Sequence, residues 1–332
     1  MNKIYRIFDA NINRALEGLR VVEEITRFIL EDKKLSTRIK GFRAQVKAVC
    51  QTIPRQELLI KIRDSQKDVG WKVYPKSEAR RADILSIFKA NIKRATEALR
   101  VLEEFSKLVD PGIGRAFKDL RFMVYDLEKE VYLAMVDYLK LEKLNFNLYV
   151  IIDPRAIGRK NILPFTKKIL SAGVKFIQYR DKQAARPVYL KNAQRIHGLA
   201  RRFGATFIVN DYVEIARQID ADGVHLGQED MAPRRARQIL GPEKIIGIST
   251  HSFKQALRAN KSQVDYFACG PIFKTLTKPW RRAVGIDLLR RVVNIAHKPV
   301  IAIGGITKEN IKLVKRTGVK QVAVINAALD LL

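Results

Sequence analysis

The chain has 332 residues, a length that favours two domains over one. Its 47% hydrophobic and 29% charged residues are typical of a globular protein and exclude an intrinsically disordered one. No apolar run is long enough to span a bilayer, and the first residues are too polar for a signal peptide. The two cysteines, Cys50 and Cys269, exclude a disulfide framework and a zinc finger. These features predict a soluble, cytoplasmic protein.

The chain is strongly basic, with 63 Lys and Arg against 34 Asp and Glu and a net charge of +29. Such a surplus suits negatively charged partners: nucleic acid, a membrane surface or small phosphorylated molecules. The basic residues are dispersed along the chain, and no nucleic-acid-binding motif is present. We therefore expect small phosphorylated substrates, no nucleic acid and no membrane partner; the oligomeric state stays open, a homo-oligomer included. A solvated Lys/Arg-rich surface is the simpler alternative.

From Tyr5 to about Leu144, apolar residues recur at three- and four-residue steps, which predicts helices. The segment also repeats itself, because residues 7–24 match residues 87–104 at thirteen of eighteen positions. Arg43 and Arg121 continue the match further along the chain. Two equivalent helical units should pack about a pseudo-twofold axis. We therefore predict an all-α bundle with an internal repeat over residues 1–144.

From Asn147 onward, short β-rich runs alternate with helical stretches, the pattern of parallel βαβ units. Eight such units in the remaining residues predict an α/β domain, a closed TIM (β/α)8 barrel over residues 145–332. A doubly wound sheet is the alternative. The predicted strands are Asn147–Asp153, Lys175–Arg180, Thr206–Asn210, Gly223–Leu226, Ile245–Ser249, Tyr266–Gly270, Val300–Gly304 and Gln321–Ile325.

Polar residues gather where the predicted strands end, which is where TIM barrels place their functional residues. Two carboxylates at adjacent strand ends, Asp211 and Asp230, suit a Mg²⁺ ion that keeps waters and takes phosphate oxygens. Three cations, Arg180, Lys182 and Lys278, can neutralise a diphosphate. The glycines after the seventh strand and the backbone amides after the eighth can bind a phosphate.

Each of these residues also has a simpler structural interpretation. Asp211 and Asp230 could cap the helices that follow them, and Ser249 could cap the next helix. Gln178 could be an ordinary interior polar group, and His225, within the fourth strand, a core histidine with both nitrogens satisfied. Their joint placement on one rim of the barrel favours the functional interpretation.

The half from about Asn147 to Ala328 resembles thiamine phosphate synthase. The resemblance rests on the motifs QYRDK at 178–182, VND at 209–211, ADGVHLGQED at 221–230, IGIS at 246–249, GPIFKTLTK at 270–278, AIGGI at 302–306 and VAVIN at 322–326. It implies that the aminopyrimidine diphosphate would be bound by Gln178, Arg180, Lys182, Asn210, Ser249 and Lys278, with Mg²⁺ on Asp211 and Asp230. Of these, the resemblance gives catalytic roles to Arg180, Lys182, Ser249 and Lys278. The thiazole phosphate would be bound by Thr275, Thr277, Gly305, Ile325 and Asn326.

The resemblance implies that 4-amino-2-methyl-5-hydroxymethylpyrimidine diphosphate is condensed with 4-methyl-5-(2-phosphoethyl)thiazole to give thiamine phosphate and pyrophosphate. Such a reaction needs positioning and charge neutralisation rather than a nucleophilic side chain. Two departures from the family are Lys274, where proline is usual, and Asn326, where serine is usual. Binding by a backbone N–H survives the second change, whereas a hydroxyl contact would not. A thiazole tautomerase-like relative is the alternative on the same fold.

Each copy of the helical repeat contains the same four polar residues, spaced three residues apart on one broad helix face. The set is Asn11, Arg14, Glu17 and Arg20 in the first copy and Asn91, Arg94, Glu97 and Arg100 in the second. It could form a ligand site or only a solvated salt-bridge ladder. Between the copies, the segment RDSQKDVG at 63–70 could bind a phosphate and a metal through Arg63, Asp64 and Asp68, or form a plain turn.

This half is similar to the small helical hydroxymethylpyrimidine phosphate kinases that often occur fused to thiamine phosphate synthase. The resemblance rests on ANINRALEGLRVVEE at 10–24 and on the segment 63–70. It implies conversion of the pyrimidine monophosphate to the diphosphate with ATP as co-substrate and Mg²⁺. No GxxxxGK[ST] motif is present, so the domain would not be a P-loop kinase. We expect a bifunctional enzyme; a non-catalytic regulatory or dimerisation domain is the alternative.

Overall fold

The computed structural model describes residues 2–63, 80–275 and 280–332. The chain divides into two compact units, one up to Tyr138 and one from Leu139 onward. Among the described residues, no helix is both long and apolar enough to cross a membrane.

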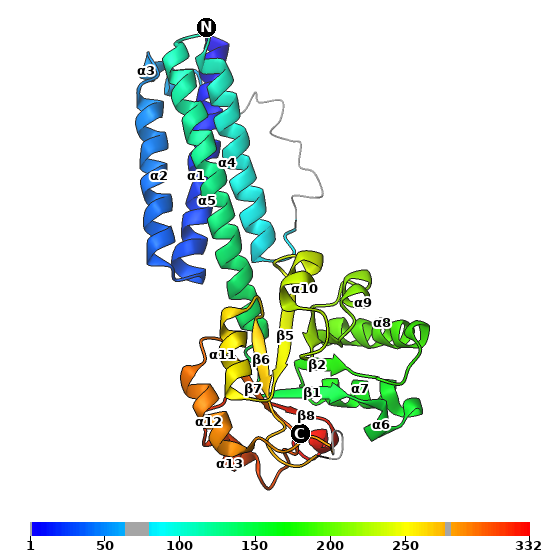
Figure 1. The fold of residues 1–332 in the computed structure, drawn as a ribbon. Helices are drawn as coiled ribbons and strands as arrows, with labels where there is room; N and C mark the ends of the chain where they lie inside the picture. Colours follow the sequence, from blue (N-terminus) through cyan, green and yellow to red (C-terminus); the bar gives the residue numbers. More distant parts are fainter. Residues whose placement is uncertain (1, 64–79, 276–279) are drawn as a thin grey trace. The chain divides into compact units, whose positions relative to one another are not determined.

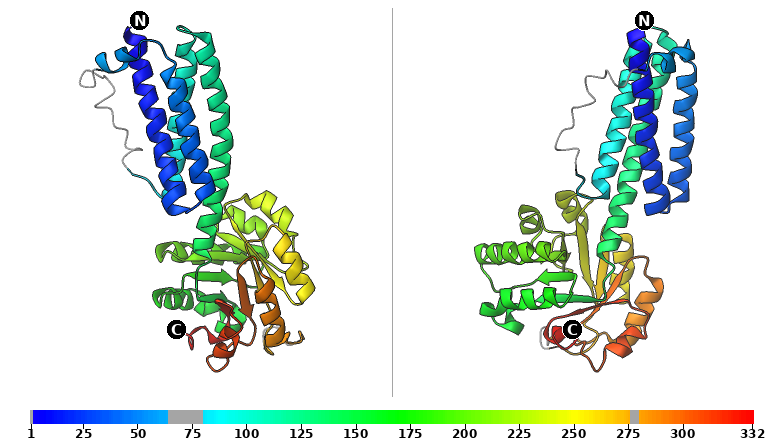
Figure 2. Two further views of the ribbon diagram at one scale, coloured as in Figure 1. Left: turned by 90° about the vertical axis from the view of Figure 1, so that its left-hand side faces the viewer. Right: turned by 180° about the vertical axis from the view of Figure 1, so that it is seen from behind.

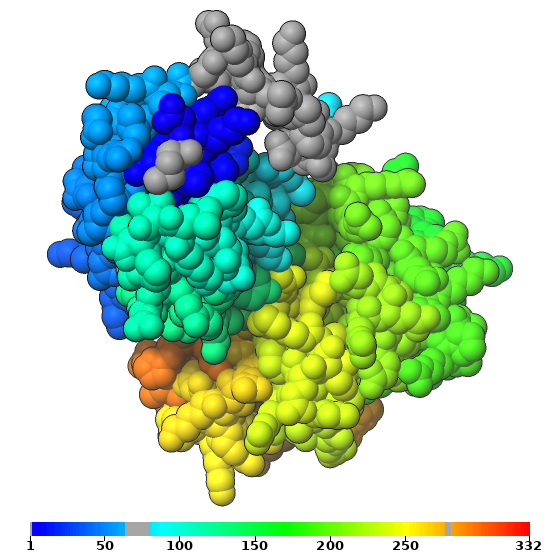
Figure 3. Space-filling model, turned by 90° about the horizontal axis from the view of Figure 1, so that it is seen from above, coloured from blue at the N-terminus to red at the C-terminus, as the bar shows by residue number. Residues whose placement is uncertain are grey.

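The first unit is helical throughout its described part, as the repeat pattern predicts (Figures 1 and 2). Its long helices lie side by side, and the start of α1 lies at the same end of the bundle as the turn between α4 and α5 (Figure 3). Aspartates begin two of the helices: the Asp32 carboxylate accepts from Leu35 N at 2.9 Å, and Asp83 forms a capping box with Ser86. The elements are α1 (Asn2–Glu24), the π-helix η1 (Ile25–Ile29), α2 (Lys33–Gln51), α3 (Gln56–Lys61), α4 (Ile84–Ser106) and α5 (Pro111–Lys143).

The two copies of the repeat, α1 and α4, pack against each other through equivalent residues. Phe8 and Leu19 of α1 and their counterparts Phe88 and Leu99 are fully buried in one core. Small residues let the helices approach closely, because a Cβ added at Gly18 would lie 2.6 Å from the carbonyl oxygen of Asn91. The repeated sequence therefore builds one shared core.

The second unit is a closed barrel of eight parallel strands in sequential order, with β8 pairing back to β1. The predicted fold class is confirmed, and each predicted strand is present. The strands are β1 (Leu148–Ile152), β2 (Phe176–Tyr179), β3 (Thr206–Asn210), β4 (Gly223–Leu226), β5 (Ile245–Thr250), β6 (Tyr266–Cys269), β7 (Val300–Ile303) and β8 (Gln321–Val324). Around them lie α6 (Pro154–Ile157), η3 (Arg159–Asn161), α7 (Ile162–Ser171), α8 (Arg186–Arg202), α9 (Val213–Gln218), α10 (Pro233–Leu240), α11 (Phe253–Lys261), α12 (Gly285–Ile295), α13 (Ile311–Lys315) and η4 (Asn326–Ala328).

Alternate residues of each strand point into the barrel and fill its lower part. Tyr149, Phe176 and Tyr266 meet edge to face there, with ring centroids 4.6 to 6.2 Å apart. Gly247 makes this packing possible, because a Cβ at that position would lie 2.1 Å from the Tyr266 ring. The barrel is therefore filled below, and the next inward-facing residues of the strands lie around a pocket.

Candidate active site

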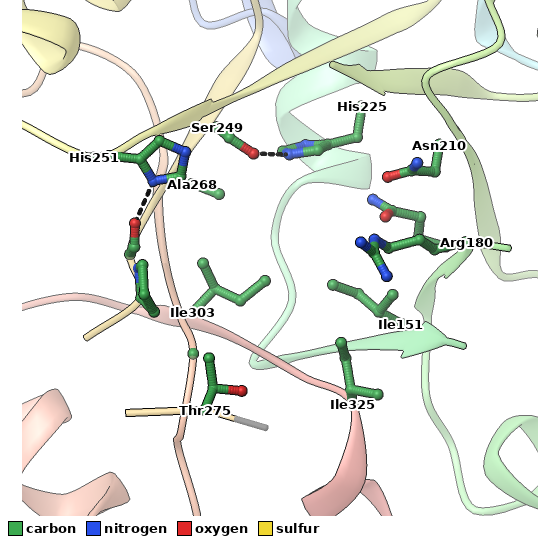
Figure 4. A pocket seen from close by; sticks show the side chains of 14 residues that line it. Ile151, Arg180, Asn210, His225, Ser249, His251, Ala268, Thr275, Ile303 and Ile325 are labelled. Carbon is green, nitrogen blue, oxygen red and sulfur yellow. Dashed lines mark hydrogen bonds between the residues drawn. The ribbon is translucent and has the colours of Figure 1, made fainter. Parts of the chain in front are cut away.

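A pocket lies at the carboxyl ends of the barrel strands, and most of its polar lining was predicted from the sequence (Figure 4). Gln178 from β2, Arg180 just beyond it, Asn210 from β3, and Ser249 from β5 all contribute. The apolar part of the lining comes from Ile151, Ala268, Ile303 and Ile325. The strand ends thus combine polar with apolar lining residues, which suits a heteroaromatic ligand that carries charge.

Arg180 is a buried, oriented cation rather than a surface charge. Its side chain is 10% exposed, and its guanidinium donates to the carboxylate of Asp153, which follows β1. Arg155 donates to the same carboxylate at 2.8 Å. Burial acts to raise the pKa of Asp153, but Arg155 and Arg180 together lower it below its usual value. Asp153 therefore stays ionised and holds Arg180 in the pocket wall.

Asp211 and Asp230 lie within hydrogen-bonding reach of each other, and the Lys182 ammonium donates to Asp211. Burial and the neighbouring Asp230 raise the pKa of Asp211. Asp211 has a left-handed backbone with φ of 64°, and its side chain does not cap α9. Asp230 accepts from Gly227 N at 2.6 Å, and α10 begins only at Pro233. The capping interpretation of both residues is therefore wrong.

Two carboxyl groups this close together are a suitable donor set for Mg²⁺, which prefers hard oxygen ligands. No group of three or more metal-ligating side chains occurs in the part of the chain that the structure describes. An ion on Asp211 and Asp230 would therefore take its remaining ligands from water or substrate, as Mg²⁺ bound to a diphosphate does.

Ser249 and His225 face each other across the pocket lining, with Ser249 Oγ 2.9 Å from His225 Nε2 (Figure 4). The other ring nitrogen of His225 lies 3.0 Å from the Tyr266 hydroxyl. His225 is thus the satisfied core histidine that the sequence indicated, although it also lines the pocket. Ser249 does not cap α11, because Ser252 takes that role. The side chain of Gln228 donates to the Ser249 carbonyl at 2.5 Å.

A second pocket at the ends of β7 and β8 contains most of the residues predicted for the thiazole phosphate, and it shares lining residues with the first. Gly304 and Gly305 have φ of +99° and +66°, which only glycine adopts readily. Their missing side chains also let the segment after β6 lie against them, since a Cβ at Gly305 would meet Lys274 O at 2.6 Å. The predicted residues placed here are Thr275, Gly305, Ile325 and Asn326. Thr277 and Lys278 lie outside the described residues.

In the helical unit, half of the repeated arginines form the salt-bridge ladder. Arg20 binds Glu23 and Glu24 of its own helix, at 3.4 and 2.5 Å. Arg100 binds the equivalent acids, Glu103 and Glu104, at 3.0 Å each. The side-chain amides of Asn11 and Asn91 donate to helix carbonyls four residues before them, at 2.8 Å each.

The remaining members of the repeated set are exposed and lie on α1 and α4, the two helices that meet at Gly18. They are Arg14, Glu17, Arg94 and Glu97. Of the segment between the repeats, Arg63 donates to the Asp9 carboxylate at 2.7 and 2.5 Å. Asp64 and Asp68 lie outside the described residues.

Sequence reasoning missed three parts of the barrel site: Asp153, the buried hydroxyls of Tyr149 and Tyr266, and His251. His251 lines the pocket, and its Nδ1 bonds the Gly270 carbonyl (Figure 4). Asp153 did carry a signal, because it is an acidic residue directly after an apolar strand. The tyrosines occupy inward positions of their strands but resemble ordinary strand residues in sequence.

Comparisons with known proteins cover both units. A family model described as thiamine monophosphate synthase matches residues 148–328, and one described as the ThiD2 family matches residues 6–130. The chain is 39% identical to a thiamine-phosphate synthase of Synechocystis sp. over 328 residues, which cover 98% of this chain and 92% of the relative. A thiamine-phosphate synthase of Thermosynechococcus vestitus is 39% identical over 329 residues, with 98% and 91% covered. A solved structure, the thiamine phosphate pyrophosphorylase from Pyrococcus furiosus, is 37% identical with a TM-score of 0.51, covering 56% of this chain and 88% of that one.

Proposed function

The chain belongs to the thiamine monophosphate synthase family and is a thiamine phosphate synthase, and from this premise we propose which reaction each part of the chain catalyses. Residues 145–332 condense the aminopyrimidine diphosphate with the thiazole phosphate, and residues 1–144 make that diphosphate from the monophosphate and ATP. Both reactions take place in the cytoplasm. The observation that carries the first assignment is the oriented Arg180 in one pocket with Asn210 and Ser249, near the Asp211–Asp230 pair.

The diphosphate can leave only when positive groups neutralise its negative charge. Arg180 supplies an oriented, charged donor, because the Asp153 carboxylate binds its guanidinium. Lys182 can turn from Asp211 to a phosphate oxygen, since its side chain is 48% exposed. Asp211 and Asp230 would hold Mg²⁺, which supplies positive charge to the diphosphate oxygens. Lys278 completes the cation set by resemblance.

The pyrimidine ring fits the polar wall made by Gln178, Asn210 and Ser249, against the apolar wall opposite. The thiazole phosphate binds at Gly305 and Asn326, where backbone N–H groups are available to its oxygens. Because the two pockets share lining residues, both rings are held next to each other. The C–O bond to the diphosphate breaks, the aminopyrimidine carries the resulting methylene cation, and the thiazole nitrogen gives its lone pair to that carbon. The protein contributes positioning and charge.

The test of the synthase assignment uses the full chain with Mg²⁺, the pyrimidine diphosphate and the thiazole phosphate, and measures thiamine phosphate and pyrophosphate. We expect the two products in equal amounts. Arg180→Gln should lower kcat/KM by about a hundredfold, because a charged hydrogen bond to the leaving group is lost. Arg234→Gln, at an exposed arginine outside the pocket, is the matched control. Equal activity of the two variants would contradict the assignment.

The kinase assignment is supported by the match of residues 6–130 to the ThiD2 family and by the repeated polar set on α1 and α4. We place the anion-binding role on the exposed Arg14 and Arg94, because Arg20 and Arg100 are bound to glutamates of their own helices. Asn11, Glu17, Asn91, Glu97 and the segment 63–70, with Arg63, Asp64 and Asp68, are the further candidates.

The kinase test uses the full chain carrying Asp211→Ala, which blocks the barrel reaction so that the pyrimidine diphosphate accumulates. We expect ATP-dependent diphosphate formation from the monophosphate but not from the unphosphorylated alcohol, which lacks the anchoring charge. Arg14→Gln should lower this activity more than Arg20→Gln does. A folded variant that makes no diphosphate would favour a regulatory or dimerisation domain instead.

A further inference from the structure

Five hydrogen-bonded side chains form a continuous chain across the barrel interior, ending at the active-site pocket. It runs from Gln178 through Tyr149, Tyr266 and His225 to Ser249, with successive separations of 2.5, 3.1, 3.0 and 2.9 Å. The members come from strands β2, β1, β6, β4 and β5 in that order. The first three are at most 1% exposed, and Ser249 lines the pocket. The hydrogen-bonded chain therefore joins two side chains of the pocket lining, Gln178 and Ser249, through the buried hydroxyls of Tyr149 and Tyr266 and the ring of His225.

The amide of Gln178 sets the direction of these hydrogen bonds. Its Nε2 can only donate, so the Tyr149 hydroxyl accepts. Among the described residues, the Tyr149 hydroxyl has one other hydrogen-bond partner, the Tyr266 hydroxyl. Tyr149 must donate to it, because its hydrogen would otherwise be buried without an acceptor.

The same reasoning applies to the next two members. Tyr266 accepts from Tyr149, so its own hydrogen goes to His225 Nδ1, which must then be the unprotonated nitrogen of a neutral ring. His225 Nε2 carries the hydrogen and donates to Ser249 Oγ. Ser249 keeps its own hydroxyl hydrogen for the pocket. In the reverse order, Ser249 would donate its hydroxyl hydrogen to His225, and the hydroxyl hydrogen of Tyr149 would have no acceptor.

We propose that this chain sets Ser249 as a hydrogen-bond donor to the bound pyrimidine diphosphate, with His225 and Tyr266 as positioning residues. The role of Ser249 in turnover rests on the proposed function of the pocket, whereas the direction of the hydrogen bonds does not. Two features hold the chain in place: Gly247 leaves the space that the Tyr266 ring fills, and the His225 and Tyr266 rings stack with centroids 5.5 Å apart. A ligand atom beside Ser249 must then be an acceptor, a ring nitrogen or a phosphate oxygen.

The direct test is the tautomer of His225 in the full chain labelled with ¹⁵N-histidine, read from long-range ¹H–¹⁵N correlations. The assignment of the His225 signals comes from a His225→Gln variant. We expect a neutral ring protonated on Nε2. Protonation on Nδ1, or a doubly protonated ring at neutral pH, would overturn the proposal. The measurement needs no substrate, so it decides the direction of the hydrogen bonds whether or not the protein makes thiamine phosphate.

The effect on turnover is tested by a double-mutant cycle. Tyr266→Phe removes the donor to His225 and should lower kcat/KM about threefold to tenfold. In a Ser249→Ala background the same change should have almost no effect, because it acts through the serine hydroxyl. The matched control is Tyr179→Phe, a buried tyrosine whose hydroxyl bonds Asp181 and Asn192 instead. Its effect should be equal in both backgrounds. Equal effects of Tyr266→Phe in both backgrounds would overturn the proposal.

Discussion

The carboxylate of Asp153 accepts a hydrogen bond from the guanidinium of Arg180, the cation that lines the active-site pocket. Both side chains come from the ends of neighbouring strands, since β1 and β2 pair in parallel and end together. Arg155 binds the same carboxylate, at 2.8 Å. The cation that we propose binds the diphosphate is thus held in place before substrate arrives, which reduces the entropy lost on binding.

Asp153→Asn keeps the shape of this carboxylate and removes its charge, so that Arg180 loses its fixed orientation. We expect kcat/KM for the pyrimidine diphosphate to fall by about tenfold to a hundredfold, the usual range for a residue that orients a binding group. Asp181→Asn is the matched control, because Asp181 is equally buried but binds Arg159 and backbone amides. It should lower thermal stability and leave kcat/KM nearly unchanged. Similar kinetic losses in both variants would show that Asp153 acts only on stability.

Asp211→Asn and Asp230→Asn should each raise the Mg²⁺ concentration that gives half-maximal synthase activity by about tenfold or more, because each removes one charged oxygen ligand. The assay titrates Mg²⁺ at fixed substrate concentrations. Asp220→Asn serves as the control, since the Asp220 side chain is 87% exposed and pairs with Lys244. An unchanged Mg²⁺ dependence in both pocket variants would rule out this pair as the metal site.

Gly18 and Gly41 offer a matched pair of glycine substitutions within helices. A Cβ at Gly18 would lie 2.6 Å from Asn91 O, whereas nothing lies within 4 Å of one at Gly41. We expect Gly41→Ala to stabilise the protein by about 0.5–1 kcal/mol through helix propensity. Gly18→Ala should destabilise it by about 1–3 kcal/mol, because α1 and α4 must move apart. Urea unfolding measures both, and stabilisation by both would argue against the close approach.

The barrel and the rim of its active site were predictable because they depend on backbone periodicity. Strand composition and spacing predict where each strand ends, and parallel strands bring those ends to one rim. That is why Asn210 and Ser249 were found together. The Asp153–Arg180 bond was not predictable, because it depends on which rotamer the arginine adopts between several acidic residues.

The repeated polar set shows the same limit on a helix. Three-residue steps predict a shared face, but they do not tell whether an arginine points to solvent or back to its own helix. Arg20 has acidic residues three and four positions later and binds both. Arg14 also has an acidic residue three positions later, Glu17, but the described residues show no ion pair between the two. The hydroxyl chain through Tyr149 and Tyr266 was missed for another reason: only closure of the barrel brings β1 and β6 within reach across its interior.

The bundle carries a buried ion pair in each repeat, Glu23 with Arg43 and Glu103 with Arg121. The Glu103 side chain is 4% exposed. Burial acts to raise its pKa, but Arg121, Arg100 and Lys107 together lower it below the usual 4.5. A carboxyl whose pKa is lower in the folded state stabilises that state above the unfolded pKa, and this stabilisation is lost as the pH falls through the folded pKa.

Arg121→Gln should therefore have two effects that can be measured together. At neutral pH it should destabilise the helical unit by about 1–3 kcal/mol, because a buried carboxylate loses one of its charged hydrogen-bond partners while Arg100 and Lys107 remain. It should also weaken the acid dependence of stability: in the unchanged protein stability is lost as the pH falls below about 4.5, whereas in the variant the folded pKa of Glu103 is less depressed and acid removes less stability. Hydrogen exchange of α4 amides between pH 3 and 7 reads this unit separately from the barrel, and Arg38→Gln, at an exposed pair with Glu130, is the control. A stability difference between Arg121→Gln and Arg38→Gln that stays the same from pH 7 to pH 3 would contradict the assignment of acid sensitivity to Glu103.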